Sequence, residues 1–143
     1  GVFRARCWTT TRKSAKQSSQ NALDMAGFSV NQMDNYQLYD AFTINTMLFL
    51  EDIGMCKKGE AKDFIKDGRI APGGDVAVNT NGGGLSCVHP GMYGIFTVIE
   101  AARQIRGDAP GQQLENIDLA LAHGNGGVLS SQVTAILGSG NTL

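Results

Sequence analysis

The stretch NTNGGGLSCVHPGMYG, residues 79–94, holds three consecutive glycines and, after four intervening residues, the only His-Pro pair of the chain. Glycine loses more conformational entropy on folding than any other residue, so an ordered run of it must serve a purpose. Bare backbone is needed in a tight turn, where a helix packs closely on a sheet, or where a ligand lies against the main chain. The stretch is compatible with all three uses.

The segments on both sides of this stretch alternate between strand and helix. Residues 34–39 and 75–79 have the length and alternation of strands. After Pro90, which a helix tolerates in its first turn, a helix is predicted that closes at Gly107. Its apolar residues recur at helical spacing: Met92, Ile95, Phe96, Ile99 and Ala102.

Further helices are predicted over residues 12–26, 40–54 and about 60–66, and residues 2–10 remain open between a short strand and a lead-in segment. The first helix has a face of small residues, made of Ala15, Ser18, Ser19, Ala22 and Ala26, and Gly27 ends it. The second has an apolar face made of Ile44, Met47 and Leu48.

The C-terminal segment has the pattern of a β-hairpin. Ile117, Leu119 and Leu121 alternate, a glycine turn follows, and a second strand is predicted over about 128–137. Strands that alternate with helices up to a final hairpin indicate an α/β layered domain with a mixed sheet, which we expect to be of the five-stranded type. No internal repeat or domain boundary is visible, so residues 1–143 are predicted to form one domain.

The composition limits the function classes. With 42% apolar and 17% charged residues, the chain has a globular composition, and its net charge of −1 without a basic stripe argues against a nucleic-acid surface. No apolar run reaches membrane-spanning length and no secretory signal is visible. The three cysteines, Cys7, Cys56 and Cys87, match no zinc or disulfide framework, so we predict a cytoplasmic protein with reduced thiols and no metal site.

Three predicted strands end in polar or glycine-rich turns. The first gives Tyr39 and Asp40, the second gives Asn79 and the glycines before His89, and the third gives His123 and GNGG. Ligands of α/β sheets gather at the carboxyl ends of strands. Because an imidazole titrates near neutral pH, we expect the two histidines to converge on one cleft and to transfer protons there.

Structural roles compete with each of these assignments. A histidine beside a turn often serves structure, Tyr39 has the character of an aromatic resting on the core, and Asp40 is a good cap for the following helix. Cys87 lies two residues from His89, an awkward spacing for a nucleophile and its base. The glycine run lacks the Lys-Ser/Thr of a phosphate loop.

Three pieces of the chain together resemble the C-terminal domain of thiolases, in particular the lipid-transfer-protein and sterol-carrier-protein-2 type that includes the steroid side-chain aldolases. They are LYDAFTINTMLFLEDIGMCKKGE, VNTNGGGLSCVHPGMYGIFTVIEAARQIRG and LAHGNGGVLSSQVTAILG, in the family's order. Asn79, Gly82 and Gly83 match the family's Asn-x-x-Gly-Gly pattern, and Val88-His89-Pro90 stands at its Gly-His-Pro.

The resemblance assigns roles to individual residues. It implies that His89 activates the nucleophile and helps hold the thioester oxygen, and that His123 stands where a second cysteine shuttles a proton. The backbone at Asn125 and Gly126 would contribute to an oxyanion hole, and Asn125 is compatible with this role because Asn tolerates a left-handed turn conformation.

The remaining roles that the resemblance implies concern the proton chemistry and the substrate. Tyr39 and Asp40 stand in the family's Asn-Glu-Ala-Phe motif, with a tyrosine that is similar to that of the aldolase branch. Asn79 and Gly83 would bind substrate.

Two departures from the family pattern matter. Val88 replaces the motif glycine, and the acyl-accepting cysteine belongs to the family's N-terminal half, so the chain looks like the last third of a thiolase subunit. The resemblance therefore implies the C-terminal part of an enzyme that cleaves or forms C–C bonds in acyl-CoA, by acyl transfer or retro-aldol chemistry. The alternative is a non-catalytic subunit that binds lipid or acyl-CoA or acts as a scaffold.

The resemblance also implies which molecules the chain meets. Coenzyme A thioester would be the substrate and no cofactor would be bound covalently. The expected partners are an N-terminal thiolase half or subunit, a protein with an OB-fold, and further copies of the chain.

Overall fold

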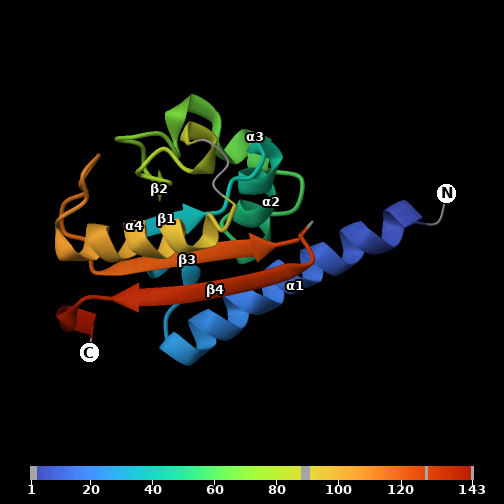
Figure 1. Ribbon diagram of the computed structural model, residues 1–143, viewed down its shortest axis with the longest axis horizontal. Coiled ribbons are helices and arrows are strands. Elements are labelled where there is room, and N and C mark those ends of the chain that lie inside the picture. Colours follow the sequence, from blue (N-terminus) through green and yellow to red (C-terminus); the bar gives the residue numbers. More distant parts are fainter. Residues whose placement is uncertain (1–2, 88–90, 128, 143) are drawn as a thin grey trace.

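A four-stranded mixed sheet forms the centre of the computed structural model, which describes residues 3–87, 91–127 and 129–142 (Figure 1). The strand order is β2-β1-β3-β4. The central strand β1 runs parallel to β2 and to β3, whereas β3 and β4 form an antiparallel hairpin. The strands are β1 (Asn35–Leu38), β2 (Ala77–Val78), β3 (Leu119–Gly126) and β4 (Ser131–Gly138).

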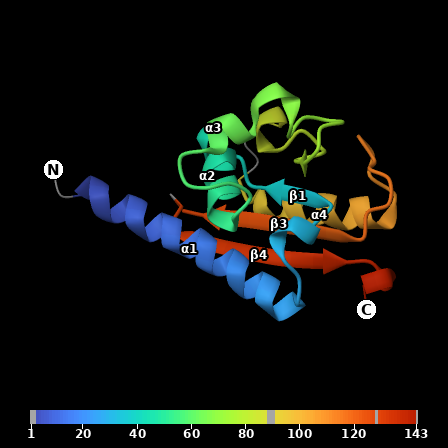
Figure 2. The ribbon, with the colours of Figure 1, turned by 180° about the vertical axis from the view of Figure 1, so that it is seen from behind.

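Helices cover both faces of this sheet. On one face lie α1 (Phe3–Ala26), which runs along β4, and α2 (Thr43–Ile53) (Figure 2). On the other face α4 (Gly94–Arg106) crosses β1 and β3. The shorter elements are α3 (Ala61–Phe64) and the 3₁₀ turns η1 (Val30–Gln32), η2 (Lys66–Gly68), η3 (Gly84–Ser86) and η4 (Gly140–Thr142).

The two faces of β3 have different cores because successive side chains of a strand point to opposite sides. Leu119 and Leu121 belong to the larger core under α1 and α2, which includes Phe49. Ala120 and Ala122 face α4, where Ala101 packs against them. The small residues on this second face let α4 lie close to the sheet.

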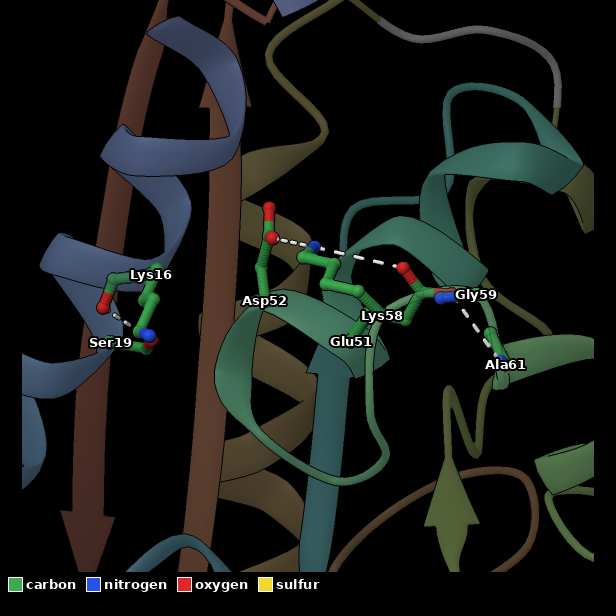
Figure 3. A network of polar contacts seen from close by, with 7 residues as sticks. All are labelled: Lys16, Ser19, Glu51, Asp52, Lys58, Gly59 and Ala61. Atoms are coloured by element: carbon green, nitrogen blue, oxygen red, sulfur yellow. Dashed lines mark hydrogen bonds and ion pairs between the residues drawn. The ribbon is translucent and has the colours of Figure 1, made fainter. Parts of the chain in front are cut away.

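A polar cluster orders the connection between α2 and α3 (Figure 3). The Lys58 ammonium pairs with Asp52 and lies 3.7 Å from the Glu51 carboxylate. Glu51 also accepts hydrogen bonds from the backbone N–H groups of Gly59 and Ala61, at 2.9 and 3.3 Å. The segment after α2 is therefore held by side chains of α2 itself.

The predicted α/β layered architecture with a terminal hairpin is confirmed, but the expectation of five strands is wrong, since the described residues form four. Residues 2–10, left open, belong to α1 from Phe3 onward. The small-residue face of α1 is confirmed in part: Ala15 and Ser19 are fully buried, whereas Ala26 is exposed.

The packing face of α2 differs from the predicted one. Phe49, Leu50 and Ile53 are buried, whereas Ile44 is 44% exposed. This helix is apolar nearly all round, so spacing alone does not select the face that meets the core.

The apolar stripe of α4 faces solvent rather than the sheet. Met92, just before the helix, is 86% exposed and Ile95 is 56% exposed, and Phe96 and Ile99 are also exposed. A helix that covers a sheet usually turns its apolar side to the sheet and its polar side to solvent, and α4 has the opposite arrangement.

Polar residues form the buried side of α4. Glu100 is 4% exposed, and it accepts hydrogen bonds from the Thr80 hydroxyl at 2.6 Å and the Gln104 amide at 2.9 Å. Thr80 in turn accepts a hydrogen bond from Gln37 of β1 at 2.9 Å. Because Glu100, Thr80 and Gln104 find hydrogen-bond partners in one another, α4 can bury its polar side and leave the apolar stripe outside.

Candidate active site

Three strand ends meet at one edge of the sheet, as the sequence predicts. The Asn79 side chain, directly after β2, accepts a hydrogen bond from Leu38 N–H at 2.7 Å and donates one to Leu38 C=O at 3.0 Å. Directly after β1, Tyr39 N–H donates to the carbonyl of His123 on β3 at 3.0 Å. The turns that carry the candidate residues are therefore fixed to one another by hydrogen bonds.

The Asp40 carboxylate clamps the glycine loop. It is 3% exposed and accepts hydrogen bonds from the backbone N–H groups of Gly84, at 2.5 Å, and Leu85, at 3.3 Å. Gly83 has φ +69°, and a Cβ on it would overlap the Asp40 carboxylate and lie 2.9 Å from the Asn79 amide nitrogen. The bare backbone of the opening stretch thus serves close packing of a loop on a buried carboxylate.

One expectation for these residues changes. The helix cap of α2 is Phe42, so Asp40 does not cap that helix and instead serves the N–H groups of η3. Asn79 has φ +49° and its side chain bonds the backbone of Leu38, and its role in substrate binding stays a prediction.

An Asp40→Asn variant is expected to lower the free energy of unfolding by about 1–3 kcal/mol, because an amide NH₂ would face a backbone N–H donor. Urea denaturation measures this change. The control is Asp108→Asn, which removes a surface pair with Arg106 and is expected to cost at most about 1 kcal/mol. Equal losses in the two variants would contradict the clamp.

A groove of about 800 Å³ opens beside this loop, between the end of β1, the start of α4 and the β3–β4 turn. Its lining is largely apolar, with a few polar groups, as is usual for ligand sites. The lining residues are Tyr39, Ala41, Phe42, Asn45, Gly91, Met92, Gly94, Ile95, Asn125, Gly126, Gly127 and Leu129.

Tyr39, Asn125 and Gly126, predicted from separate parts of the sequence, line this same groove. Tyr39 is 8% exposed and meets Tyr93 edge to face, with ring centroids 5.3 Å apart. It therefore rests on the core and borders the groove at once. Asn125 lies in the extended strand β3 and has no positive φ, so the left-handed conformation that Asn tolerates is not used here.

Two groove or near-groove residues escaped the sequence analysis. Asn45 of α2 is 2% exposed and lines the groove, and its only sequence signal is an amide within an apolar helix. Tyr93 donates a hydrogen bond to Asn81 at 3.3 Å, and burial raises the pKa of Tyr93 to about 12. A buried phenol of this kind stays protonated and supports Tyr39 by packing.

His123 does not line the groove. It lies within β3 rather than beyond it, is fully buried, and packs against Phe49 of α2 with ring centroids 4.5 Å apart. Its Nδ1 is 2.8 Å from the Thr134 hydroxyl and its Nε2 is 2.9 Å from Gln132 Oε1. The expectation that its imidazole reaches the cleft is wrong, because residues 119, 121 and 123 share the face toward α1 and α2.

Burial lowers the pKa of His123 from 6.5 to about 4, and the hydrogen bond to Gln132 opposes this shift. The unfolded chain therefore takes up a proton at this residue at higher pH than the folded chain. We expect the free energy of unfolding to fall by about 3 kcal/mol from this group as pH drops from 6.5 to 4, with no loss from it above that range.

Urea denaturation at several pH values between 7 and 4 measures this dependence. A His123→Asn variant removes the titrating group, so its curve should be flatter than that of the wild type over the same range. Parallel curves for the two proteins would contradict the burial of a neutral imidazole.

Val88, His89 and Pro90 lie outside the described residues. Gly91, two positions after His89, lines the groove. Cys56 and Cys87 are free thiols, and burial raises the pKa of Cys56. Within the described residues, no group of three or more His, Cys, Asp or Glu side chains is placed to hold a metal ion, and no helix is long and apolar enough to cross a membrane.

Comparisons with known proteins show what the chain is similar to. The chain is 33% identical over 114 residues to the benzoylsuccinyl-CoA thiolase subunit BbsB of Thauera aromatica, covering 78% of this chain and 30% of that protein. It is 43% identical over 82 residues to the 17-hydroxy-3-oxo-4-pregnene-20-carboxyl-CoA lyase of Mycobacterium tuberculosis, covering 57% and 21%. The chain thus spans about a third or less of the length of these relatives.

A solved structure has a similar fold. The Ltp2-ChsH2(DUF35) aldolase matches 90% of this chain and 32% of its own chain, with a TM-score of 0.78 and 32% identity. The family model described as thiolase C-terminal domain-like matches residues 3–139. The chain therefore belongs to the thiolase C-terminal domain-like family.

Proposed function

We propose that this chain is the C-terminal part of a thiolase-like enzyme that forms or cleaves a C–C bond in a coenzyme A thioester. The observation that carries the proposal is the groove in which Tyr39, Asn125, Gly126 and the segment following His89 meet. The names of two relatives contain CoA thioesters, which supports this substrate class. Thiolysis, condensation and retro-aldol cleavage all need a base and donors for a developing oxyanion.

In this proposal His89 is the base and a donor to the thioester oxygen. Asp40 supports that role from a distance, because it fixes Gly84 and Leu85 a few residues before His89. Tyr39 lines the groove, and the proposal gives its phenol the exchange of a proton with substrate; Asn125 and Gly126 line the same space. No covalently bound cofactor is required for these steps.

The nucleophilic cysteine and much of the coenzyme A site would come from the remaining part of a thiolase subunit. The chain covers only about 30% of the length of the thiolase subunit that it resembles. The exposed stripe of Met92, Ile95, Phe96 and Ile99 adjoins the groove through Met92 and Ile95. We propose that the N-terminal thiolase half covers this stripe, since large exposed apolar patches mark interaction sites.

A second candidate function is a binding or scaffold subunit without catalysis of its own, and the open apolar groove of the chain by itself favours it. Relatives described as a thiolase subunit and as an Ltp2-ChsH2 aldolase indicate assembly with other chains. Partner subunits, including one with an OB-fold, and further copies of this chain belong to the proposal in either case.

The experiment replaces the matched C-terminal region of the Thauera thiolase subunit with this chain and follows thiolytic cleavage of benzoylsuccinyl-CoA, with free coenzyme A supplied as the acyl acceptor. Turnover by the joined protein, and none by the remaining Thauera segment or by this chain alone, is the expected result. Calorimetric titration of this chain with benzoyl-CoA runs in parallel. Micromolar binding by the lone chain, together with an inactive but folded joined protein, would favour the binding subunit and overturn the enzyme.

A further inference from the structure

We infer that His123 is a positioning residue that holds the β3–β4 turn, one wall of the groove, and ties that turn to α1. The inference rests on the proposed function only in taking the groove as the acyl-CoA site. Its support is a continuous series of hydrogen bonds that begins on α1, passes through both imidazole nitrogens and ends on a backbone carbonyl of the groove wall.

The hydrogen-bond partners fix the proton on the imidazole. The Gln132 amide nitrogen donates to the Leu129 carbonyl at 3.2 Å, so its oxygen is the atom that faces His123. An amide oxygen only accepts, and therefore His123 Nε2 carries the hydrogen. Nδ1 is then an acceptor, and the Thr134 hydroxyl donates to it at 2.8 Å.

The series continues to α1 on the other side. The Thr134 hydroxyl has given its proton to His123, so its oxygen accepts from the Ser18 hydroxyl, 3.0 Å away. Thr134 and Gln132 are two residues apart on β4 and present their side chains on one face. A neutral imidazole, with one donor and one acceptor, bridges them while both partners remain satisfied.

The far end of the series bears on the groove. Leu129 lines the groove and has φ +58°, a left-handed conformation that costs a residue with a side chain about 1–2 kcal/mol. Strained backbone persists only where its surroundings over-determine it, and the Gln132 amide on the Leu129 carbonyl is such a restraint.

The backbone of the same histidine reaches the opposite wall, because its carbonyl accepts the Tyr39 N–H at 3.0 Å. The side chain of His123 thus restrains the turn through Gln132, and its backbone restrains Tyr39. The contacts of its ring are with Thr134, Gln132 and Phe49, none of which titrates. The buried carboxylate on α2, Asp52, is paired with Lys58.

Nitrogen-15 NMR of the histidine-labelled chain tests the assignment without any ligand. We expect one imidazole with the proton on Nε2 and no change of its signals between pH 7 and 5, and a His123→Asn variant identifies which of the two histidines gives them. A proton on Nδ1, or full protonation within this range, would overturn the series. Since no acyl-CoA is present, this outcome is independent of the test of the proposed function.

Amide hydrogen exchange tests the positioning role. Thr134→Val removes the donor to Nδ1, and we expect exchange at Gly126 and Gly127 to become at least about tenfold faster, while Thr134→Ser restores the wild-type rate. Amides of α4, such as those of Ala101 and Gln104, should change less than those of the turn. A uniform change at turn and helix, or none at the turn, would overturn the inference. Gln132→Leu, which cuts the series at its other end, gives the same contrast should Thr134→Val fail to fold.

Discussion

Replacing His89 with alanine is expected to lower kcat/KM of the joined enzyme by about 10²- to 10⁴-fold, because a positioned general base contributes about that factor. The proposed second role, as a donor to the thioester oxygen, places the loss toward the upper end, since one oxyanion donor is worth about 10²- to 10³-fold. The steady-state rate of benzoylsuccinyl-CoA cleavage measures the effect.

Two controls separate chemistry from folding in this experiment. Urea denaturation of the His89→Ala protein should give the wild-type free energy of unfolding, and the surface variant Asp108→Asn should keep the wild-type rate. His89→Asn, which retains a donor but no base, is expected to recover part of the lost oxyanion stabilisation and none of the base function. A folded His89→Ala enzyme with the wild-type kcat/KM would remove His89 from the mechanism.

The convergence of the strand ends was predictable from the sequence, because it follows from a general property of parallel strands. Tyr39 and Asn79 follow two strands whose carboxyl ends share one edge, and the turn at Asn125 follows a third. Simple alternation also predicted the hairpin. The strand ends and the hairpin can be predicted from the period of the apolar residues and the direction of each strand alone.

The side on which His123 lies was not predictable from the GNGG turn alone. The strand continues through Gly126, so a turn expected directly after His123 begins later. Within a strand, successive side chains point alternately to the groove side and to the α1/α2 side. An error of one residue in the predicted strand end therefore assigns a side chain to the wrong face. The half-buried polar partners Thr134 and Gln132 carry no signal of their own in a sequence.

The sequence also could not predict which side of α4 packs against the sheet. Its apolar period predicts a helix, and a helix is present, but a period cannot say which layer lies against the stripe. Glu100 and Gln104 are buried because Thr80 hydrogen-bonds to both of them, and Gln37 of β1 in turn donates to Thr80. The proposed N-terminal thiolase half would cover this apolar stripe, which is turned away from the sheet of its own domain.

Gly83→Ala is expected to lower the free energy of unfolding by about 4 kcal/mol, a large share of the stability of an ordinary domain. The backbone of Gly83, with φ +69° and ψ −174°, has a conformation that essentially only glycine adopts, and this accounts for about 1–3 kcal/mol of the loss. The remainder arises because the new Cβ overlaps the Asp40 carboxylate, which must move and release Gly84 and Leu85, and a buried hydrogen bond to a charged group is worth about 1.5–3 kcal/mol.

A second glycine isolates the contact from the backbone conformation. Gly107 is left-handed, with φ +74° and ψ 23°, and has nothing within 4 Å of a Cβ built on it, so Gly107→Ala is expected to cost about 1–2 kcal/mol from its backbone conformation alone. Combining Gly83→Ala with Asp40→Ala removes the overlap, so the double variant should lose less than the sum of the single variants. Urea denaturation measures these losses in the free energy of unfolding. Strictly additive losses in the double variant, or equal losses for Gly83→Ala and Gly107→Ala, would mean that Gly83 is needed for the turn conformation alone and not for packing on the Asp40 carboxylate.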